Sequence, residues 1–310
     1  MLTVAEFDKL AEKVNNWGRW GHEDERGTLN LITPDVVRKA SSCVVTGETY
    51  SLAMGLSLNG PQIPGTAVPG RINPVRTMLA VNTPMLDAPD ACAYSDDIVV
   101  TPTQAATHWD ALSHCSHRGV MYNGIPANEI NAFGATRLGI EAAGDIVSRG
   151  VLLDVARHQG VERLPGKFAV TREILEAVEQ SQGVSVEEGD IVLIRTGQAA
   201  YFLEGDVPRY RSSVPALEYD APLYFHERGA AAVAIDNMPM ELLPSHVTDL
   251  GLPVHVLCLI MMGMIQGQNW VLEDLAAACA SDGRYTFLLN ATPEKFLWST
   301  GGMVHPVAVR

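Results

Sequence analysis

The sequence predicts an α/β fold, and three short apolar segments carry this prediction. "GVLLDVAR" (150–157), "GDIVLIRTG" (189–197) and "AAAVAIDNM" (230–238) are rich in valine, isoleucine, leucine and alanine. Short runs of this kind next to glycine are typical of strands buried on both faces of a sheet. Segments with helical features lie between and after them, and such alternation indicates a layered α/β architecture.

The segment between the first two strands has the clearest helix signals. In "TREILEAVEQSQG" (171–183), Thr171 is a suitable N-cap and Gly183 a suitable end. Further along, 253–264 fits a helix or a strand by composition, although Pro253 suits a first helical turn. The remaining predicted elements are a helix over 220–230, a helix over 271–283 and a strand over 286–293.

The 310 residues contain no internal repeat, low-complexity tract or linker. The Pro/Gly-rich stretch 57–75 is longer than most connections, and loops of that length are often functional or cover a site. We therefore predict a single domain over 1–310, with the N-terminal segment 1–35 packed on it and a long loop at 57–75.

Composition narrows the class of protein. Hydrophobic residues make up 47% and charged residues 19%, as in a well-packed enzyme, and the net charge of −14 argues against a nucleic-acid partner. No signal peptide is evident in 1–14, and the most apolar run, 252–265, is too short to cross a membrane. Five cysteines without a CxxC pair indicate a reducing cytoplasm, and the reactivity of Cys115 stays open.

A concentration of metal-binding residue types occurs in "QAATHWDALSHCSHRG" (104–119). Gln104, His108, Asp110 and His114 are all at even positions, so in an extended segment their side chains would share one face. Imidazole nitrogen and carboxylate oxygen together suit Zn²⁺ or Mn²⁺. An ordinary hydrogen-bonded core histidine explains such a short pattern equally well. His117 precedes Arg118-Gly119, a turn signal, and we expect it at the surface.

Together with "GVMYNG", the stretch "THWDALSH" resembles the cyclase family of metal-dependent hydrolases, in the long-chain branch with a TxWDALxH motif. That family includes kynurenine formamidase, isatin hydrolase and trans-dienelactone hydrolase. The segments "WGHEDERGTLNLIT" (20–33), "EEGDIVLIRTG" and "AAVAIDNMPMEL" also look like family blocks in family order. The likeness extends over nearly the whole chain.

This resemblance implies a swivelling β/β/α-type domain with a mixed sheet and flanking helices, assembled as a homodimer or homotetramer. It also implies a divalent metal ion that activates water. By position, His108 and Asp110 correspond to metal ligands and His114 to a proton shuttle. His255 and Gln268 stand where the family has a late histidine and a glutamate.

Two departures from the family pattern bear on the metal. Gln104 replaces the leading histidine and Gln268 the late glutamate. A neutral amide binds a cation through one carbonyl oxygen, so we expect one weakly held ion rather than two, with Mn²⁺ suiting an oxygen-rich shell better than Zn²⁺. The opposite inference is also open, in which His114 and Asp110 work as an acid/base pair without metal.

The function expected from these residues is hydrolysis of an amide or lactone bond in a small cyclic or aromatic substrate. Asp110 would orient the water and His114 would move its proton. A metal-independent cyclase or dehydratase, or a catalytically inactive small-molecule binder, are the alternatives. Four tryptophans would suit a flat substrate, although core packing explains at least two of them equally well: Trp17, Trp20, Trp109 and Trp270.

Overall fold

A mixed sheet organises the computed structural model, which describes residues 1–63 and 68–310. Nine strands lie in the order β1-β15-β13-β7-β9-β11-β12-β4-β14. They are β1 (Thr49–Ser51), β4 (His108–Asp110), β7 (Val147–Asp154), β9 (Ile191–Arg195), β11 (Ala232–Ile235), β12 (Gln266–Gln268), β13 (Thr286–Asn290), β14 (Gly301–Met303) and β15 (Val307–Val309).

Four neighbouring strands, β7, β9, β11 and β12, run parallel, and antiparallel pairs flank them on both sides. Residues of β9 and β11 are completely buried, as expected for parallel strands covered on both faces. The three predicted strands are β7, β9 and β11, and the strand predicted over 286–293 is β13. The predicted single α/β domain with a mixed sheet and flanking helices is confirmed.

Helices flank this sheet. The α-helices are α1 (Val4–Lys13), α2 (Pro34–Ser41), α3 (Val155–His158), α4 (Arg172–Gln182), α5 (Ala199–Leu203), α6 (Val207–Tyr210), α7 (Ala221–Arg228), α8 (Pro253–His255) and α9 (Glu273–Asp282). Short helical turns are η1 (Gly27–Leu31), η2 (Tyr122–Gly124), η3 (Ala127–Glu129) and η4 (Ile140–Ala143), and a π-helical segment is η5 (Val256–Met262). Small two-stranded pairs join β8 (Ala169–Val170) to β10 (Ala216–Leu217) and β5 (Ile130–Asn131) to β6 (Gly134–Ala135).

The predicted caps are confirmed in α4. The Thr171 hydroxyl accepts a hydrogen bond from the Ile174 amide at 3.3 Å, and Gly183 ends the helix in the left-handed region at φ 62°. The segment 253–264, for which helix and strand were both open, is helical. It begins as α8 at Pro253 and continues as η5 to Gly263, which also has a positive φ.

The N-terminal segment packs on the body through this helical segment. The Asn16 amide donates to the Met262 carbonyl at 3.1 Å, and the Trp17 indole donates to the Ile260 carbonyl at 2.7 Å. In the predicted loop 57–75, residues 57–63 and 68–74 form no helix or strand, while 64–67 lie outside the described residues.

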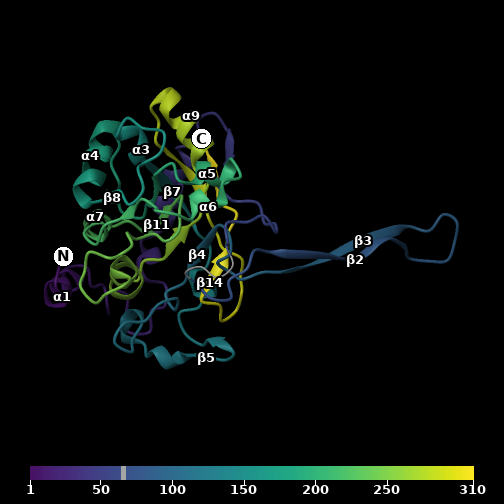
Figure 1. Ribbon diagram of the computed structural model, residues 1–310, viewed down its shortest axis with the longest axis horizontal. Coiled ribbons are helices and arrows are strands. Elements are labelled where there is room, and N and C mark those ends of the chain that lie inside the picture. The colour runs from purple at the N-terminus through teal and green to yellow at the C-terminus, as the bar shows by residue number, and fades with distance from the viewer. Residues whose placement is uncertain (64–67) are drawn as a thin grey trace.

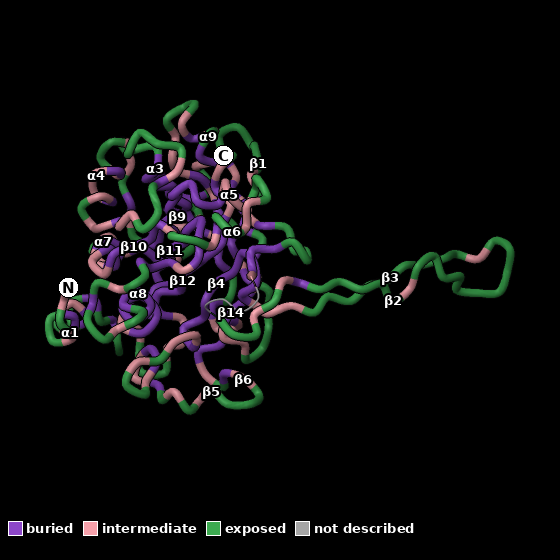
Figure 2. Tube along the Cα trace, viewed as in Figure 1, coloured by how far each residue is buried: buried purple, intermediate pink, exposed green. Residues whose placement is uncertain are grey.

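A long hairpin projects from the body. It pairs β2 (Val75–Pro84) with β3 (Ala93–Val100), and nearly all of its residues are exposed (Figures 1 and 2). The sequence reasoning did not anticipate this hairpin. Over the described ranges, none of the helices has the length and apolar character needed to span a membrane.

Candidate functional site

The site is built on β4, which lies between β12 and β14 in the sheet. His108 is opposite Gln268 and Met303, and Asp110 is opposite Gln266 and Gly301. Residues opposite each other on neighbouring strands share a face, so these side chains are presented together. Trp109 points to the other face, where it packs edge-on against Trp270 with ring centroids 5.0 Å apart.

Only part of the predicted extended segment is a strand. β4 covers His108–Asp110, whereas Gln104 lies in a turn closed by the Ala105 amide and the Pro102 carbonyl. His114 follows a second turn, in which its own amide donates to the Ala111 carbonyl at 2.9 Å. The expectation of one four-residue strand face is therefore wrong, although the two turns bring Gln104 and His114 back beside Asp110.

His108 and Asp110 are both buried, and each has an atom without a hydrogen-bond partner. His108 Nδ1 donates to the Ala106 carbonyl at 2.6 Å, so the lone pair of the neutral ring is on Nε2. That Nε2 lies 3.5 Å from Asp110 Oδ1, and neither atom has a partner among the described residues. Two unpartnered electron-pair donors at this spacing fit a divalent cation between them.

His114 brings a third donor to the same point. Its Nε2 lies 3.7 Å from Asp110 Oδ1, and its side chain is 24% exposed, so a small molecule can reach it. Its Nδ1 is 2.9 Å from the amide nitrogen of Gln104, which also donates to the Thr300 carbonyl at 3.3 Å. Gly301 makes room for this amide, because a Cβ at that position would stand 2.5 Å from it.

His255 lies on the other side of Asp110. Its Nε2 is 3.8 Å from Asp110 Oδ2, and its Nδ1 is hydrogen-bonded to Glu241, which also accepts from the Val254 amide at 2.9 Å. Burial acts to lower the pKa of His255, but the Glu241 carboxylate outweighs it, and the pKa is raised. A carboxylate behind a histidine is also the usual support of a metal-bound imidazole.

Gln268 contacts Asp110 through its nitrogen. Its Nε2 donates to Asp110 Oδ2 at 2.6 Å, while its Oε1 accepts from the Met240 amide at 3.1 Å. The expectation that Gln104 and Gln268 present carbonyl oxygens to an ion therefore differs from the arrangement found, in which both turn nitrogen toward the site. Against burial, the imidazoles of His114, His108 and His255 hold the pKa of Asp110 well below its usual range.

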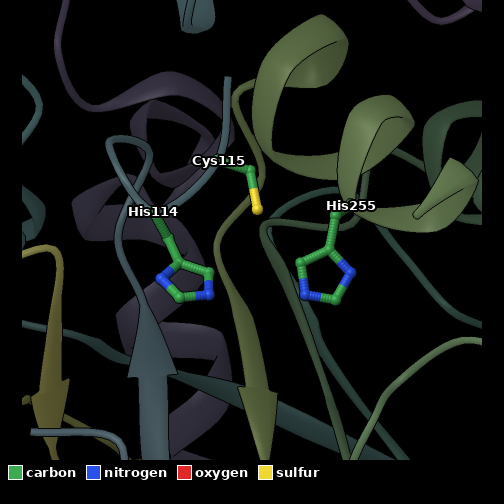
Figure 3. Close-up of side chains that lie close together, drawn as sticks. All are labelled: His114, Cys115 and His255. Atoms are coloured by element: carbon green, nitrogen blue, oxygen red, sulfur yellow. The ribbon is translucent and has the colours of Figure 1, made fainter. Parts of the chain in front are cut away.

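His114, Cys115 and His255 form a second grouping, with candidate ligand atoms within 4.8 Å of one another (Figure 3). Burial raises the pKa of the Cys115 thiol far above its usual range, so the thiol stays protonated. Cys115 therefore offers a weak donor here, and the stronger donors are the His108 imidazole and the Asp110 carboxylate.

Sequence reasoning missed two polar residues of this site. Glu241, which positions His255, stands alone in an apolar segment without a local pattern that would mark it. Gln266 is completely buried, and both polar atoms of its side chain are without a partner among the described residues. Its alternation with Gln268 along β12 places it on the face of Asp110, and that alternation is visible in "IQGQ".

The four tryptophans are divided between core and surface. Trp109 and Trp270 have no exposed surface, which agrees with core packing and leaves no face for a substrate. Trp17 is 36% exposed. The Arg19 guanidinium lies over the Trp20 ring, 4.7 Å from the centroid of that ring. Substrate contact by Trp17 and Trp20 stays a prediction. His117 lies in the predicted turn, half-buried, with Arg118 and Gly119 both at positive φ.

These features define an α/β protein with a buried His/Asp cluster whose donor set fits one divalent cation. The model of the Cyclase family matches residues 50–241, and the chain belongs to that family. It is also similar to the crystal structure of a novel cyclase, with 35% identity and a TM-score of 0.86, over 96% of this chain and 100% of that one.

Two more distant structures share the fold. Isatin hydrolase A from Labrenzia aggregata is 18% identical with a TM-score of 0.59, over 87% of this chain and 94% of its own. A predicted metal-dependent hydrolase from Bacillus stearothermophilus is 17% identical with a TM-score of 0.52, over 84% of this chain and 97% of its own. A comparison with curated proteins gives no match. The fold is thus related to that of metal-dependent hydrolases.

Proposed function

We propose that this protein is a hydrolase that opens an amide or lactone bond of a small cyclic or aromatic substrate with one divalent metal ion, Mn²⁺ or Zn²⁺. The observation that carries the proposal is the buried pair of unpartnered donors, His108 Nε2 and Asp110 Oδ1, 3.5 Å apart. Leaving two such atoms without a partner is costly unless something binds them. These two atoms would supply one nitrogen and one oxygen ligand, donor types that both ions accept.

When bound, such an ion lowers the pKa of water and polarises a carbonyl group. The residues around it have separate tasks. Asp110 stays ionised across the physiological range because the surrounding imidazoles hold its pKa low. The Ala106 carbonyl fixes the tautomer of His108, so that its lone pair faces Asp110.

His114 is proposed to carry protons between water and the leaving atom at its Nε2. Burial lowers its pKa, which keeps the ring neutral near pH 7. Gln104 can serve either tautomer of the ring: its Nε2 donates to Nδ1 as found, and a half-turn of the amide would present its oxygen to a protonated Nδ1. A histidine at position 104 would offer less freedom of this kind.

Metal analysis combined with a turnover screen tests the proposal. The protein is purified without chelator, its Mn and Zn contents are measured, and acid release from small cyclic amides and lactones is followed by pH-stat. About one metal ion per chain and turnover that EDTA abolishes would support the hydrolase. Turnover that EDTA leaves unchanged would refute metal dependence.

One observation favours a second candidate, a metal-independent cyclase or dehydratase. His255 faces Asp110, and its raised pKa favours the protonated ring, so a positive charge beside Asp110 does not require a metal. In that case His114 and Asp110 would move protons on their own. Protein without metal that converts a substrate without hydrolysing it would select this candidate. Protein with neither metal nor turnover would leave an inactive small-molecule binder.

Self-association, as a homodimer or homotetramer, is also proposed. The hairpin of β2 and β3 exposes a series of large apolar side chains, and an isolated two-stranded hairpin is only marginally stable in water. Packing against a second copy of the chain would cover them. A reducing, cytoplasmic location is supported by five cysteines that form no disulfide among the described residues.

A further inference from the structure

Two arginines near the site, Arg71 and Arg211, have no carboxylate partner in the described part of the chain. Both contact Met238. Arg71 Nη1 lies 3.5 Å from its sulfur, and Arg211 Nη1 donates to its carbonyl at 3.2 Å. Two segments far apart in sequence therefore bring two guanidinium groups to one residue.

Buried arginines elsewhere in this acidic protein are paired with carboxylates. Arg149 lies 2.6 Å from Asp190, Arg195 lies 2.5 Å from Glu273, and Arg310 lies 2.6 Å from Asp282. Arg211 has no such carboxylate among the described residues, and its Nε is buried without a hydrogen-bond partner there. Burial lowers the pKa of Arg71; the Asp110 carboxylate acts to raise it, and the positive charge of Arg211 acts to lower it. Such an arrangement is costly unless an anion joins it.

Arg71 acts electrostatically on the reactive residues, and Arg211 lines a cavity that reaches Glu241, the partner of His255. The positive charge of Arg71 interacts electrostatically with both Asp110 and His114. Arg211 lines a cavity of about 270 Å³ with Met238, Glu241 and Lys167. Glu241 would repel an anion there, but its charge is held by His255 through a direct hydrogen bond. The other charged side chains that line this cavity, Lys167 and Arg211, are cationic.

We propose that Arg71 and Arg211 form a subsite for a carboxylate group that the substrate carries in addition to the bond that is opened. The planar guanidinium fork suits a carboxylate, which can take two parallel hydrogen bonds from one arginine. The inference rests on the proposed function, and it narrows the substrate class to amides or lactones with an anionic substituent. Neutral analogues would lack the group that these two arginines require.

Binding of matched aromatic probes tests the subsite. Isothermal titration calorimetry compares phthalate with its neutral counterpart phthalamide on metal-loaded and EDTA-treated protein. We expect phthalate to bind about tenfold tighter or more in both preparations, as charge-assisted hydrogen bonds imply. Arg71→Gln and Arg211→Gln should each remove most of that preference.

Two further variants serve as controls. Arg38→Gln changes an arginine that lies exposed on α2 beside Asp35, and it should leave phthalate affinity unchanged. Arg211→Lys keeps the positive charge if Arg211→Gln fails to fold, and it should retain part of the preference. Equal affinity for phthalate and phthalamide, or a preference that Arg71→Gln and Arg211→Gln leave intact, would overturn the subsite. If EDTA treatment of the wild type removed the preference for phthalate, the carboxylate would be bound by the metal, and the subsite would be overturned as well.

Turnover separates this inference from the proposed function. Phthalide and a ring-carboxylated phthalide are assayed by pH-stat with the wild type and Arg71→Gln. If neither lactone is opened while the arginine variants still lose phthalate binding, the subsite stands and hydrolysis of this substrate class fails. If both lactones are opened equally fast by both proteins, hydrolysis stands and the subsite fails.

Discussion

Gln268 donates a hydrogen bond to Asp110, with 2.6 Å between its Nε2 and the carboxylate Oδ2. One oxygen of the buried aspartate is thereby occupied by a neutral donor, and the other, Oδ1, is left facing His108 and His114. The glutamine thus directs a single oxygen of Asp110 toward the place proposed for the ion. This geometry favours one ion over two, because a second ion would need the oxygen that Gln268 holds.

Replacing Gln268 by glutamate should exchange this hydrogen bond for repulsion between two buried carboxylates. We expect Gln268→Glu to lower the melting temperature of EDTA-treated protein and to tighten metal binding by about tenfold, since an added negative charge favours a cation. Thermal unfolding and a metal competition titration measure the two effects. Gln180→Glu, on the exposed side of α4, is the matched control. Unchanged metal affinity in Gln268→Glu would place residue 268 away from the ion.

Of the two histidines near Asp110 Oδ1, His108 should be a metal ligand and His114 a proton carrier. His108→Ala should lower metal affinity by more than the roughly 10–100-fold that loss of a supporting hydrogen bond costs. His114→Ala should lower turnover by about 10²–10⁴-fold and leave most of the metal bound. Metal content and pH-stat rates are measured on both. His158→Ala, an exposed histidine, is the control. If His114→Ala also lost its metal, His114 would be a ligand.

The buried pair of His255 and Glu241 should make stability depend on pH. The pKa of His255 is raised above its ordinary value of 6.5, so the folded state holds the proton more tightly than the unfolded state. Its contribution is therefore complete below pH 6.5 and is lost as the pH rises through the folded pKa. Glu241→Gln should remove this dependence and cost about 3 kcal/mol at low pH, because it leaves a buried group unpaired.

Urea unfolding of EDTA-treated protein between about pH 6 and 9, around the ordinary histidine pKa, measures this effect. Glu218→Gln is the matched control, because Glu218 lies 2.6 Å from His246, a histidine whose side chain is 51% exposed. That variant should change stability less than Glu241→Gln, because the exposed His246 ring leaves the pair partly screened by water. A free energy of unfolding that rises with pH in the wild type would contradict the assignment of a raised His255 pKa.

The sheet centre was predictable because its strands are marked locally. Parallel strands buried on both faces need runs of apolar residues, and such runs form 150–153 of β7, 191–194 of β9 and all of β11. For 104–114, the local sequence pattern led to a wrong prediction of one extended strand. Alternate side chains share one face only while the chain is extended, and in this segment only His108–Asp110 form a strand.

The site was predictable only in part, because its supporting contacts join distant segments. His108, Asp110 and His114 share one short stretch of sequence, so their spacing drew attention to them. Glu241 and Gln104 reach the imidazoles across turns, which no local pattern reports. The orientation of the glutamine amides was likewise out of reach, since it depends on the backbone groups of Met240 and Thr300.

The proposed self-association can be tested on the hairpin. Leu79 and Val81 on β2 are 64% and 63% exposed. If a second copy covers them, Leu79→Glu combined with Val81→Glu should convert the assembly to monomer, because burying two carboxylates in an apolar contact is costly. Light scattering after size exclusion measures the mass. Val45→Glu, at an apolar residue of the body that is 69% exposed, should leave the mass unchanged. A monomeric wild type would refute the proposal directly.

The packing behind the site leaves no room for a side chain at Gly267. This residue lies on β12 between Gln266 and Gln268, and a Cβ there would stand 2.6 Å from Trp270 Nε1 and 2.8 Å from the Ala234 Cβ. Gly267→Ala should therefore destabilise the fold by about 1–3 kcal/mol, as overpacking does. Since β12 pairs with β4, the shift should also weaken metal binding. Gly251→Ala, at a position where a Cβ would meet open space, is the control. Equal stability of the two variants would show that Trp109 and Trp270 can move aside for the added methyl group.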